Sequence, residues 1–221
     1  MRGAIGGLSQ GPVTNSCVLF PRTCPLCRRP GAAPCGACAA ELDRAPSLLI
    51  PAGLDTCTAV LAYDGAGREL VARLKYRNAR SSIAWMATNM AVLVSGYDID
   101  VVTWIPTSAS RRRSRGFDQS ELLARGVARR LRVPCRRMLM RAAGPAQTGR
   151  SLDERRLGPA FRANNDAYER VLLVDDVITT GSSMTAAAAA LRAAGVRHIA
   201  GLAGARTPLK RRVLTPENSG Q

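Results

Sequence analysis

Runs of apolar residues separated by polar stretches predict a chain in which buried strands alternate with helices. The clearest run covers residues 171–174, and Val177 and Ile178 follow after two aspartates. A β-branched and leucine-rich run of this kind is typical of a strand buried on both faces, as in a parallel sheet. An alanine-rich stretch at 184–191 comes next and has high helix propensity. This segment therefore predicts a strand that ends at the aspartates, then a loop and a helix.

The same pattern recurs along the rest of the chain. Further strands are predicted at 57–63, 101–105, 136–140 and 196–202, and further helices at 68–74, 83–94 and 120–131. Strands that alternate with helices imply a parallel sheet joined by right-handed crossovers. The expected fold class is therefore α/β, with an open and mainly parallel sheet.

Composition divides the chain into four parts. Residues 1–16 are rich in glycine and small residues and are expected to be disordered. Residues 17–50 contain paired cysteines, and residues 51–206 carry the strand and helix pattern. Residues 207–221 are basic and then polar, with prolines, which predicts a flexible tail. At 221 residues the chain can hold one α/β core and a small appendage.

Four cysteines of the appendage form two pairs. Cys24 and Cys27 make one Cys-x-x-Cys pair, and Cys35 and Cys38 make a second. Two such pairs at short separation have the spacing of a tetrahedral structural Zn²⁺ site, in which the ion replaces the core that a short segment cannot build. The alternatives are a metal-free reduced segment and a redox dithiol, although no βαβ pattern surrounds either pair. We expect a small finger, similar to a double zinc ribbon, over 17–50.

The charge balance is strongly basic, with a net charge of +16. This excess favours a polyanionic partner, although a surface on which arginine generally replaces lysine would give the same balance. No apolar segment at the start of the chain has the length of a secretory signal. The longest uncharged stretches, such as 81–97, fall short of a bilayer span. We therefore expect a cytoplasmic protein with no membrane insertion.

The strand, loop and helix at 171–191 carry chemistry that suits a ribose 5-phosphate. Such a loop lies at the carboxyl edge of the sheet, where a helix N-terminus offers free N–H groups to a phosphate. Asp175 and Asp176 supply carboxylates, which accept hydrogen bonds and so suit the vicinal hydroxyls of a ribose. The phosphate loop would consist of hydroxyl residues around one glycine, namely Thr179, Thr180, Gly181, Ser182 and Ser183. The alternative is a capped helix with two solvated aspartates.

A second loop at the same edge is cationic. The strand at 101–105 runs into polar and arginine-rich residues before the helix at 120–131. Arginine forks match the several acceptor oxygens of a pyrophosphate or of a nucleic-acid backbone. The expected contacts are Thr107, Ser108, Arg111, Arg113 and Arg115, with Lys75 from an earlier basic loop. An ordinary solvated basic loop is the alternative.

Taken together, these motifs resemble the ComF family of predicted amidophosphoribosyltransferases, which is linked to competence and DNA uptake. The resemblance runs from about Cys17 to Arg206 and includes the four-cysteine finger and the Arg115-Gly116-Phe117-Asp118-Gln119 element. Residues 171–183 resemble the phosphoribosyl-pyrophosphate (PRPP) motif of type I phosphoribosyltransferases almost residue for residue. The resemblance implies that fold, with PRPP and Mg²⁺ as ligands. The family usually has asparagine where this chain has Asp118.

Two functional hypotheses follow. The first is a transferase that uses PRPP with Mg²⁺ and an acceptor that the sequence does not identify. The second is a non-catalytic factor for natural transformation that binds single-stranded DNA, works with DNA-uptake proteins and keeps the PRPP site as a regulatory or vestigial site. No residue stands out as a general base, so the catalytic residues, enzymatic activity and oligomeric state stay open.

Overall fold

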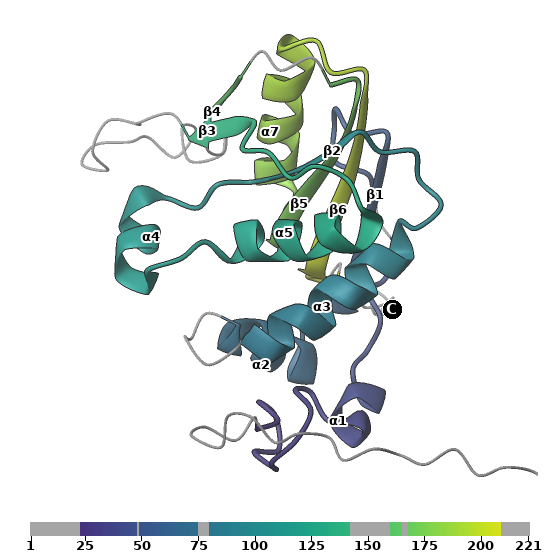
Figure 1. The fold of residues 1–221 in the computed structure, drawn as a ribbon, viewed down its shortest axis with the longest axis vertical. Coiled ribbons are helices and arrows are strands. Elements are labelled where there is room, and N and C mark those ends of the chain that lie inside the picture. The colour runs from purple at the N-terminus through teal and green to yellow at the C-terminus, as the bar shows by residue number, and fades with distance from the viewer. Residues whose placement is uncertain (1–22, 48, 75–79, 142–159, 165–167, 209–221) are drawn as a thin grey trace, which may run out of the picture.

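Four parallel strands form the central sheet of the computed structural model, which describes residues 23–47, 49–74, 80–141, 160–164 and 168–208 (Figure 1). The strand order is β1-β6-β5-β2, and every neighbouring pair is parallel. The strands are β1 (Thr56–Ala62), β2 (Val101–Trp104), β5 (Arg170–Ile178) and β6 (His198–Arg206). The predicted α/β fold with an open parallel sheet is therefore confirmed.

β5 lies inside the sheet and is buried on both faces. Leu172, Leu173 and Val174 have no exposed surface. Alternate residues of a strand point to opposite faces, so Leu172 joins one core cluster and Leu173 the other. Burying each leucine contributes about 1.5–3 kcal/mol. The strand continues through both aspartates to Ile178, beyond its predicted end, because Val177 and Ile178 still pair with β6.

Helices cover both faces of the sheet (Figure 1). α7 (Ser182–Ala193) packs on one face, while α2 (Gly65–Arg73), α3 (Arg80–Leu93) and α5 (Gln119–Leu131) pack on the other. α3 and α5 approach closely at Gly126, where an added Cβ would lie 2.7 Å from the Cβ of Ala87. These helices lie within a few residues of their predicted positions.

Two segments differ from the prediction. Residues 109–115 form a helix, α4 (Ala109–Arg115), where we expected a loop, since Ser108 caps its start and Gly116, at φ 77°, ends it. The strand expected at 136–140 is instead β3 (Leu139–Arg141), which pairs antiparallel with β4 (Phe161–Ala163) in a separate sheet. Just before β3, Cys135 forms an isolated parallel bridge to Val102 of β2.

The segment that leads from the cysteines into the sheet is held along the outer edge of β1. α1 (Gly36–Ala40) lies just before it. The N–H of Ala45 donates to the carbonyl of Val60 at 3.1 Å, and the N–H of Ala62 donates to the carbonyl of Asp43 at 3.0 Å. The predicted division at residue 50 stays a prediction, as does the finger over 17–50, of which residues 17–22 and 48 lie outside the described part.

Both predicted flexible ends lie largely outside the described residues. This holds for all of 1–16 and, within 207–221, for 209–221. Within the described ranges, no helix is long and apolar enough to cross a membrane.

Candidate functional site

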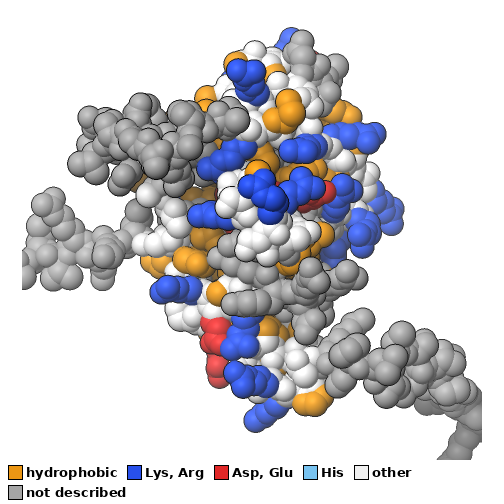
Figure 2. Space-filling view, turned by 90° about the vertical axis from the view of Figure 1, so that its left-hand side faces the viewer, with side chains coloured by type: hydrophobic (Ala, Val, Ile, Leu, Met, Phe, Trp, Pro, Cys, Tyr) orange, Lys and Arg blue, Asp and Glu red, His pale blue; other side chains and the backbone are white. Residues whose placement is uncertain are grey.

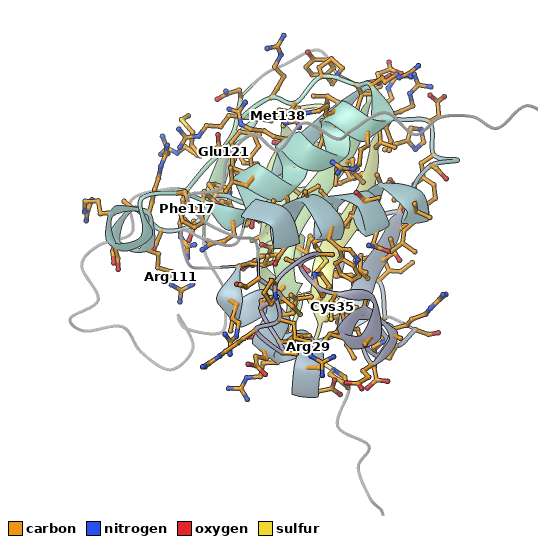
Figure 3. The ribbon with its side chains drawn as sticks, turned by 60° about the horizontal axis from the view of Figure 1, so that its bottom comes forward. Arg29, Cys35, Arg111, Phe117, Glu121 and Met138 are labelled. Carbon is orange, nitrogen blue, oxygen red and sulfur yellow. The ribbon has the colours of Figure 1, made fainter. Side chains whose placement is uncertain are left out.

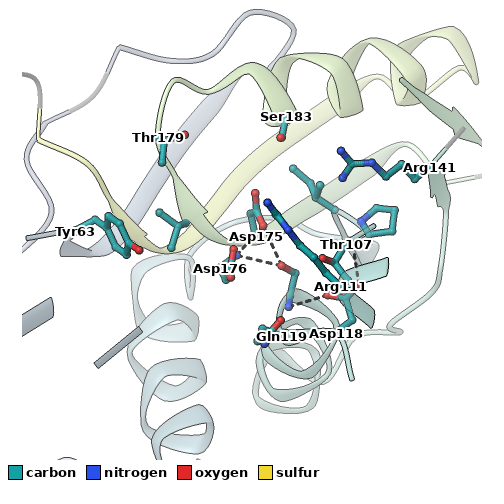
Figure 4. Close-up of a pocket in the computed structure, with 14 residues that line it drawn as sticks. Tyr63, Thr107, Arg111, Asp118, Gln119, Arg141, Asp175, Asp176, Thr179 and Ser183 are labelled. Carbon is teal, nitrogen blue, oxygen red and sulfur yellow. Dashed lines mark hydrogen bonds between the residues drawn. The ribbon is translucent and has the colours of Figure 1, made fainter. Parts of the chain in front are cut away.

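A cavity of about 420 Å³ opens at the carboxyl edge of the central sheet (Figure 4). Its walls come from the ends of β1, β2 and β5 and from the starts of α5 and α7. Six of the predicted site residues line it, namely Thr107, Arg111, Asp175, Asp176, Thr179 and Ser183. The fold therefore brings the two predicted loops to one cavity.

The two aspartates of β5 have different environments. Asp175 is buried at 9% exposure, whereas Asp176 is half-buried. The Ser120 hydroxyl donates to Oδ1 of Asp175 at 2.9 Å, and the Asp176 N–H donates to the same oxygen at 2.8 Å. Burial and then the neighbouring Asp176 raise the pKa of Asp175 well above its ordinary value. Asp176 is therefore the acid with more surface toward a ligand.

Asp118 links the cationic loop to the aspartates. It is buried, and its Oδ2 accepts from the Thr107 N–H at 2.8 Å. Its Oδ1 accepts from the N–H of Ser120 at 3.1 Å, which caps α5. Burial is the main cause that raises the pKa of Asp118. Ser120 in turn donates to Asp175, so one short chain of hydrogen bonds joins the ends of β2 and β5 through α5.

The predicted phosphate loop forms the turn into α7. Gly181 adopts the left-handed conformation at φ 82° and precedes the helix without a side-chain cap. The hydroxyls of Thr180 and Ser182 lie 2.7 Å apart. Thr179 and Ser183 line the cavity, whereas Thr180, Gly181 and Ser182 belong to the same turn outside its lining.

A proline from the N-terminal segment supports this turn. A Cβ added at Gly181 would lie 3.2 Å from Cγ of Pro51, so both the backbone conformation and the contact favour glycine. The segment continues past Gly53, where an added Cβ would lie 3.1 Å from Cβ of Ala188 on α7. The stretch after the cysteines therefore packs directly behind the loop and its helix.

Two arginines face the cavity, and one of them was not predicted. Arg111 extends from α4, and Arg141 extends from β3 on the same side (Figure 4). The Arg141 guanidinium lies 5.8 Å from the centre of the Phe161 ring. The strand before Arg141 was expected in the central sheet, so there was no reason to expect this side chain at the pocket.

Two other predicted anion contacts, Ser108 and Arg113, do not belong to the described lining of the cavity. Ser108 caps α4, accepting from the N–H of Arg111 at 3.4 Å, and Arg113 is exposed on that helix. Lys75 and the side chain of Arg115 lie outside the described part of the structure. Gln119, Ser120, Asp118 and Tyr63 line the cavity without having been predicted. Asp118 and Gln119 had a sequence signal, because both belong to the Arg115-Gly116-Phe117-Asp118-Gln119 element that carries the family resemblance.

The four cysteines of the appendage converge on one point. Their sulfur atoms all lie within 4.8 Å of one another, and those of Cys27 and Cys35 are 3.7 Å apart. Ligands at about 2.3 Å from a tetrahedral Zn²⁺ would be separated by about 3.8 Å, so the donor set and spacing fit this ion. Cys35 is labelled in Figure 3, which also shows Arg29 in the same segment. Leu26, inside the first pair, packs against the main core.

Backbone N–H groups favour the thiolate form of Cys24. Burial opposes ionisation of Cys24, but N–H groups of Cys27, Cys35 and Leu26 are directed toward its sulfur and bring its pKa to about 6. One of these, the Cys35 N–H, donates to the sulfur at 3.4 Å. A thiolate is the form that binds metal. The cluster therefore has the geometry and the donor chemistry of a metal-binding site, as the cysteine spacing predicted.

Comparison with known proteins points in the same direction. A model described as a phosphoribosyl transferase domain matches residues 118–212. Competence protein ComFC of Bacillus subtilis (strain 168) is 30% identical over 176 residues, which cover 76% of this chain and 70% of that protein. Competence protein F of Haemophilus influenzae (strain ATCC 51907 / DSM 11121 / KW20 / Rd) is 35% identical over 103 residues, 43% of this chain and 45% of that protein. The chain thus spans less than half the length of the second relative.

Solved structures show more distant likenesses. The glutamine PRPP amidotransferase from B. subtilis, complexed with ADP and GMP, is 21% identical with a TM-score of 0.42, over 60% of this chain and 30% of that one. The purine phosphoribosyltransferase from Pyrococcus horikoshii is 15% identical with a TM-score of 0.38, over 57% of this chain and 83% of that one.

Proposed function

Because the chain belongs to the ComF family of phosphoribosyltransferase-like proteins, we propose that its carboxyl-edge pocket binds PRPP together with Mg²⁺. One observation carries the proposal: a single cavity brings Asp176 together with the turn into α7 and two arginines (Figure 4). PRPP has a 5-phosphate, a ribose with vicinal hydroxyls and a pyrophosphate. The cavity offers one matching group of side chains for each part.

Each part of the pocket has a defined task in this proposal. The turn 179–183 and the first N–H groups of α7 receive the 5-phosphate, because the helix carries no side-chain cap and its dipole favours an anion there. Asp176, backed by Asp175, accepts hydrogen bonds from the ribose hydroxyls. Arg111 and Arg141 face the pyrophosphate, which presents several oxygens to planar guanidinium groups.

The residues present suit a Mg²⁺ ion that arrives with its ligand. Apart from the four cysteines, the described residues contain no cluster of three metal-ligating side chains. Magnesium usually keeps several waters and is held by one or two carboxylates together with substrate phosphates. Asp176 provides such a carboxylate at the cavity wall. When bound, the ion would neutralise part of the pyrophosphate charge.

We infer that the same pocket could support transfer of the phosphoribosyl group. Arginines fixed beside a departing pyrophosphate would stabilise its developing charge. The acceptor is unidentified, and no side chain of the described lining is assigned as a general base. For this reason we propose PRPP binding as the primary function, and transferase activity as a further step that depends on it.

A surface observation favours single-stranded DNA as a second partner. Lys and Arg side chains gather on the face of the molecule around α4 (Figure 2). Arg112 and Arg113 are exposed there, and among the described ion pairs neither has an acidic partner. Such residues suit the phosphate backbone of DNA. In this role the PRPP pocket would regulate DNA handling, in keeping with the names of the two competence relatives. A cytoplasmic location agrees with this role but stays a prediction.

Calorimetric titration tests the two roles together. The protein is titrated with PRPP in Mg²⁺ and, separately, with a single-stranded oligonucleotide at rising salt. We expect saturable PRPP binding, and DNA affinity that falls steeply with salt. Absence of PRPP binding would contradict the first role. Absence of DNA binding at low salt would remove the second.

A further inference from the structure

Two buried polar residues at the start of α5 have no task in the binding of PRPP as described so far. Asp118 and Ser120 are 5% and 4% exposed, and both belong to the lining of the cavity. Their hydrogen bonds run to the ends of β2 and β5, and dashed lines mark them in Figure 4. Burial of polar groups costs free energy, so two of them beside a cavity indicate a role in arranging it.

We propose that Asp118 and Ser120 are positioning residues, which align the pyrophosphate side and the ribose side of the pocket from one helix start. This inference rests on the proposed binding of PRPP. It goes further, because the ligand contacts alone give no role to either residue and do not connect the two sides of the pocket.

Asp118 reaches the pyrophosphate side through the backbone of its loop. Its Oδ2 accepts from the N–H of Thr107, and its Oδ1 accepts from the N–H of Ser120. A carboxylate accepts at both oxygens at once, whereas the asparagine that the family usually has here carries one acceptor oxygen and an NH₂ group that donates. An asparagine would therefore place a donor against one of these two N–H groups. The aspartate of this chain is suited to hold the loop at Thr107 and the start of α5 together.

Ser120 extends this connection to the ribose side. Its hydroxyl donates to Oδ1 of Asp175, and the same hydroxyl oxygen accepts from the N–H of Asp176 at 3.2 Å. One side chain therefore holds both the buried carboxyl group and the peptide that carries the acid with more surface toward the ligand. A shift of Ser120 would turn the Asp176 carboxylate away from the ribose hydroxyls, and small misplacements in a binding site are costly.

The order of these contacts determines which ligands each residue should affect. Asp118 touches both sides of the pocket, so loss of its bridge should weaken ligands on both sides. Ser120 touches the acids, so loss of its hydroxyl should weaken ligands that contain ribose and leave pyrophosphate binding unchanged. Residues that orient the direct ligands of a metal typically contribute about 10- to 100-fold in affinity, and we expect effects at the lower end of this range.

Calorimetric titration in Mg²⁺ with PRPP and with its two parts, ribose 5-phosphate and pyrophosphate, tests this order. Ser120→Ala should bind PRPP and ribose 5-phosphate about tenfold more weakly, and pyrophosphate within about twofold of wild type. The retained pyrophosphate affinity also shows that the variant is folded. Ser82→Ala is a matched control, because it removes a hydroxyl group from α3 that is buried at 2% exposure outside the described lining. It should match wild type for every ligand.

A double variant tests whether the two residues act in one chain. Asp118→Asn should weaken both ribose 5-phosphate and pyrophosphate by about tenfold. Asp118→Asn combined with Ser120→Ala should bind ribose 5-phosphate within about twofold of the weaker single variant, because effects within one hydrogen-bond network are not additive. Losses that multiply in the double variant would contradict the connection. Weaker binding of ribose 5-phosphate alone in Asp118→Asn would contradict its role on the pyrophosphate side.

The outcomes separate this inference from the function on which it rests. If wild-type protein binds neither PRPP nor either of its parts, both proposals are wrong. If PRPP binds and Ser120→Ala leaves its affinity unchanged, or weakens pyrophosphate binding by as much, only the positioning role is wrong.

Discussion

The four-cysteine cluster and the acidic pair of β5 both crowd groups that repel one another when ionised, but they are held in different ways. In residues 23–47 only Cys24, Ala33 and Pro34 are buried, so this segment has little core of its own. β5 is nine residues long, and the side chains just before its acids are completely buried. The finger geometry should therefore depend on an ion, whereas the pocket geometry depends on the sheet.

This difference has a functional meaning. A site built on a packed strand is formed before its ligand arrives, so a ligand does not need to order it. A site that depends on a metal links its shape to metal supply. The chain joins the two regions through Pro51, which packs behind Gly181 of the phosphate turn. Four perturbations separate the contributions of the two regions, and they follow in order of expected size.

Removal of zinc should have the largest effect. Binding of a structural Zn²⁺ contributes about 10–16 kcal/mol in small fingers, so chelation should unfold the cysteine segment while leaving the sheet folded. Amide hydrogen exchange would show loss of protection around Cys24 and Cys38 and retention in β5. Metal analysis should find one zinc per chain. Protein purified without chelators that contains no zinc would contradict the metal centre.

Leu173→Ala should give the opposite pattern. Truncation of a fully buried leucine costs about 2–5 kcal/mol, because it removes apolar contacts and leaves a cavity. Urea unfolding should show this loss in the sheet, while zinc content stays at one per chain. An exposed leucine provides the control, since Leu49→Ala, at 74% exposure, should change stability little. Equal losses from both variants would mean that the packed core is not what holds β5.

Gly181→Ala tests the contact between Pro51 and the phosphate turn, which joins the two regions. An alanine at φ 82° is strained, and its Cβ would press on Pro51, so we expect a loss of about 1–2 kcal/mol and weaker PRPP binding. Gly195→Ala is a matched control, because Gly195 also has positive φ, at 92°, but has open space around it. That variant should show the backbone strain alone, without loss of PRPP affinity. Equal PRPP affinity in the two variants would argue against a role for the Pro51 contact.

Asp175→Asn should have the smallest effect on stability of the four perturbations. It should stabilise the protein, whereas the other three destabilise it. Burial and Asp176 raise the pKa of Asp175 above its unfolded value, so the folded state holds a proton that the unfolded state releases as pH rises. Wild-type stability should therefore fall as pH rises from the unfolded pKa through the folded one. The asparagine can still accept from Ser120 and avoids the buried charge.

Thermal melting across pH measures this prediction. At neutral pH we expect a gain of about 1 kcal/mol for Asp175→Asn, or about 2–4 °C in Tm, that disappears below the unfolded pKa. Asp98→Asn, at an exposed position, should show no such pH-dependent gain. A variant less stable than wild type at neutral pH would show that ionised Asp175 stabilises the fold.

Much of the sheet could be predicted from the sequence because its strands are short apolar runs. The phosphate turn was also visible, since hydroxyls, a glycine and a helix-forming stretch stand side by side. The link from Ser120 to Asp175 spans 55 residues and depends on how α5 packs against β5, which no local pattern encodes. Arg141 lies at the pocket because β3 pairs with β4 and does not belong to the central sheet. α4 was not predicted because its run of arginines suggested a basic loop, although Ser108 and Gly116 mark its two ends.

The central claim is that Asp176, held by the packed sheet, receives the ribose of PRPP. Calorimetric titration of PRPP in Mg²⁺ against wild type, Asp176→Asn and Asp98→Asn tests it directly, since Asp98 borders a separate pocket at the opposite edge of the sheet. A hydrogen bond to a charged group contributes about 1.5–3 kcal/mol, so Asp176→Asn should bind at least about tenfold more weakly while Asp98→Asn matches wild type. Equal affinity for all three proteins would contradict the claim.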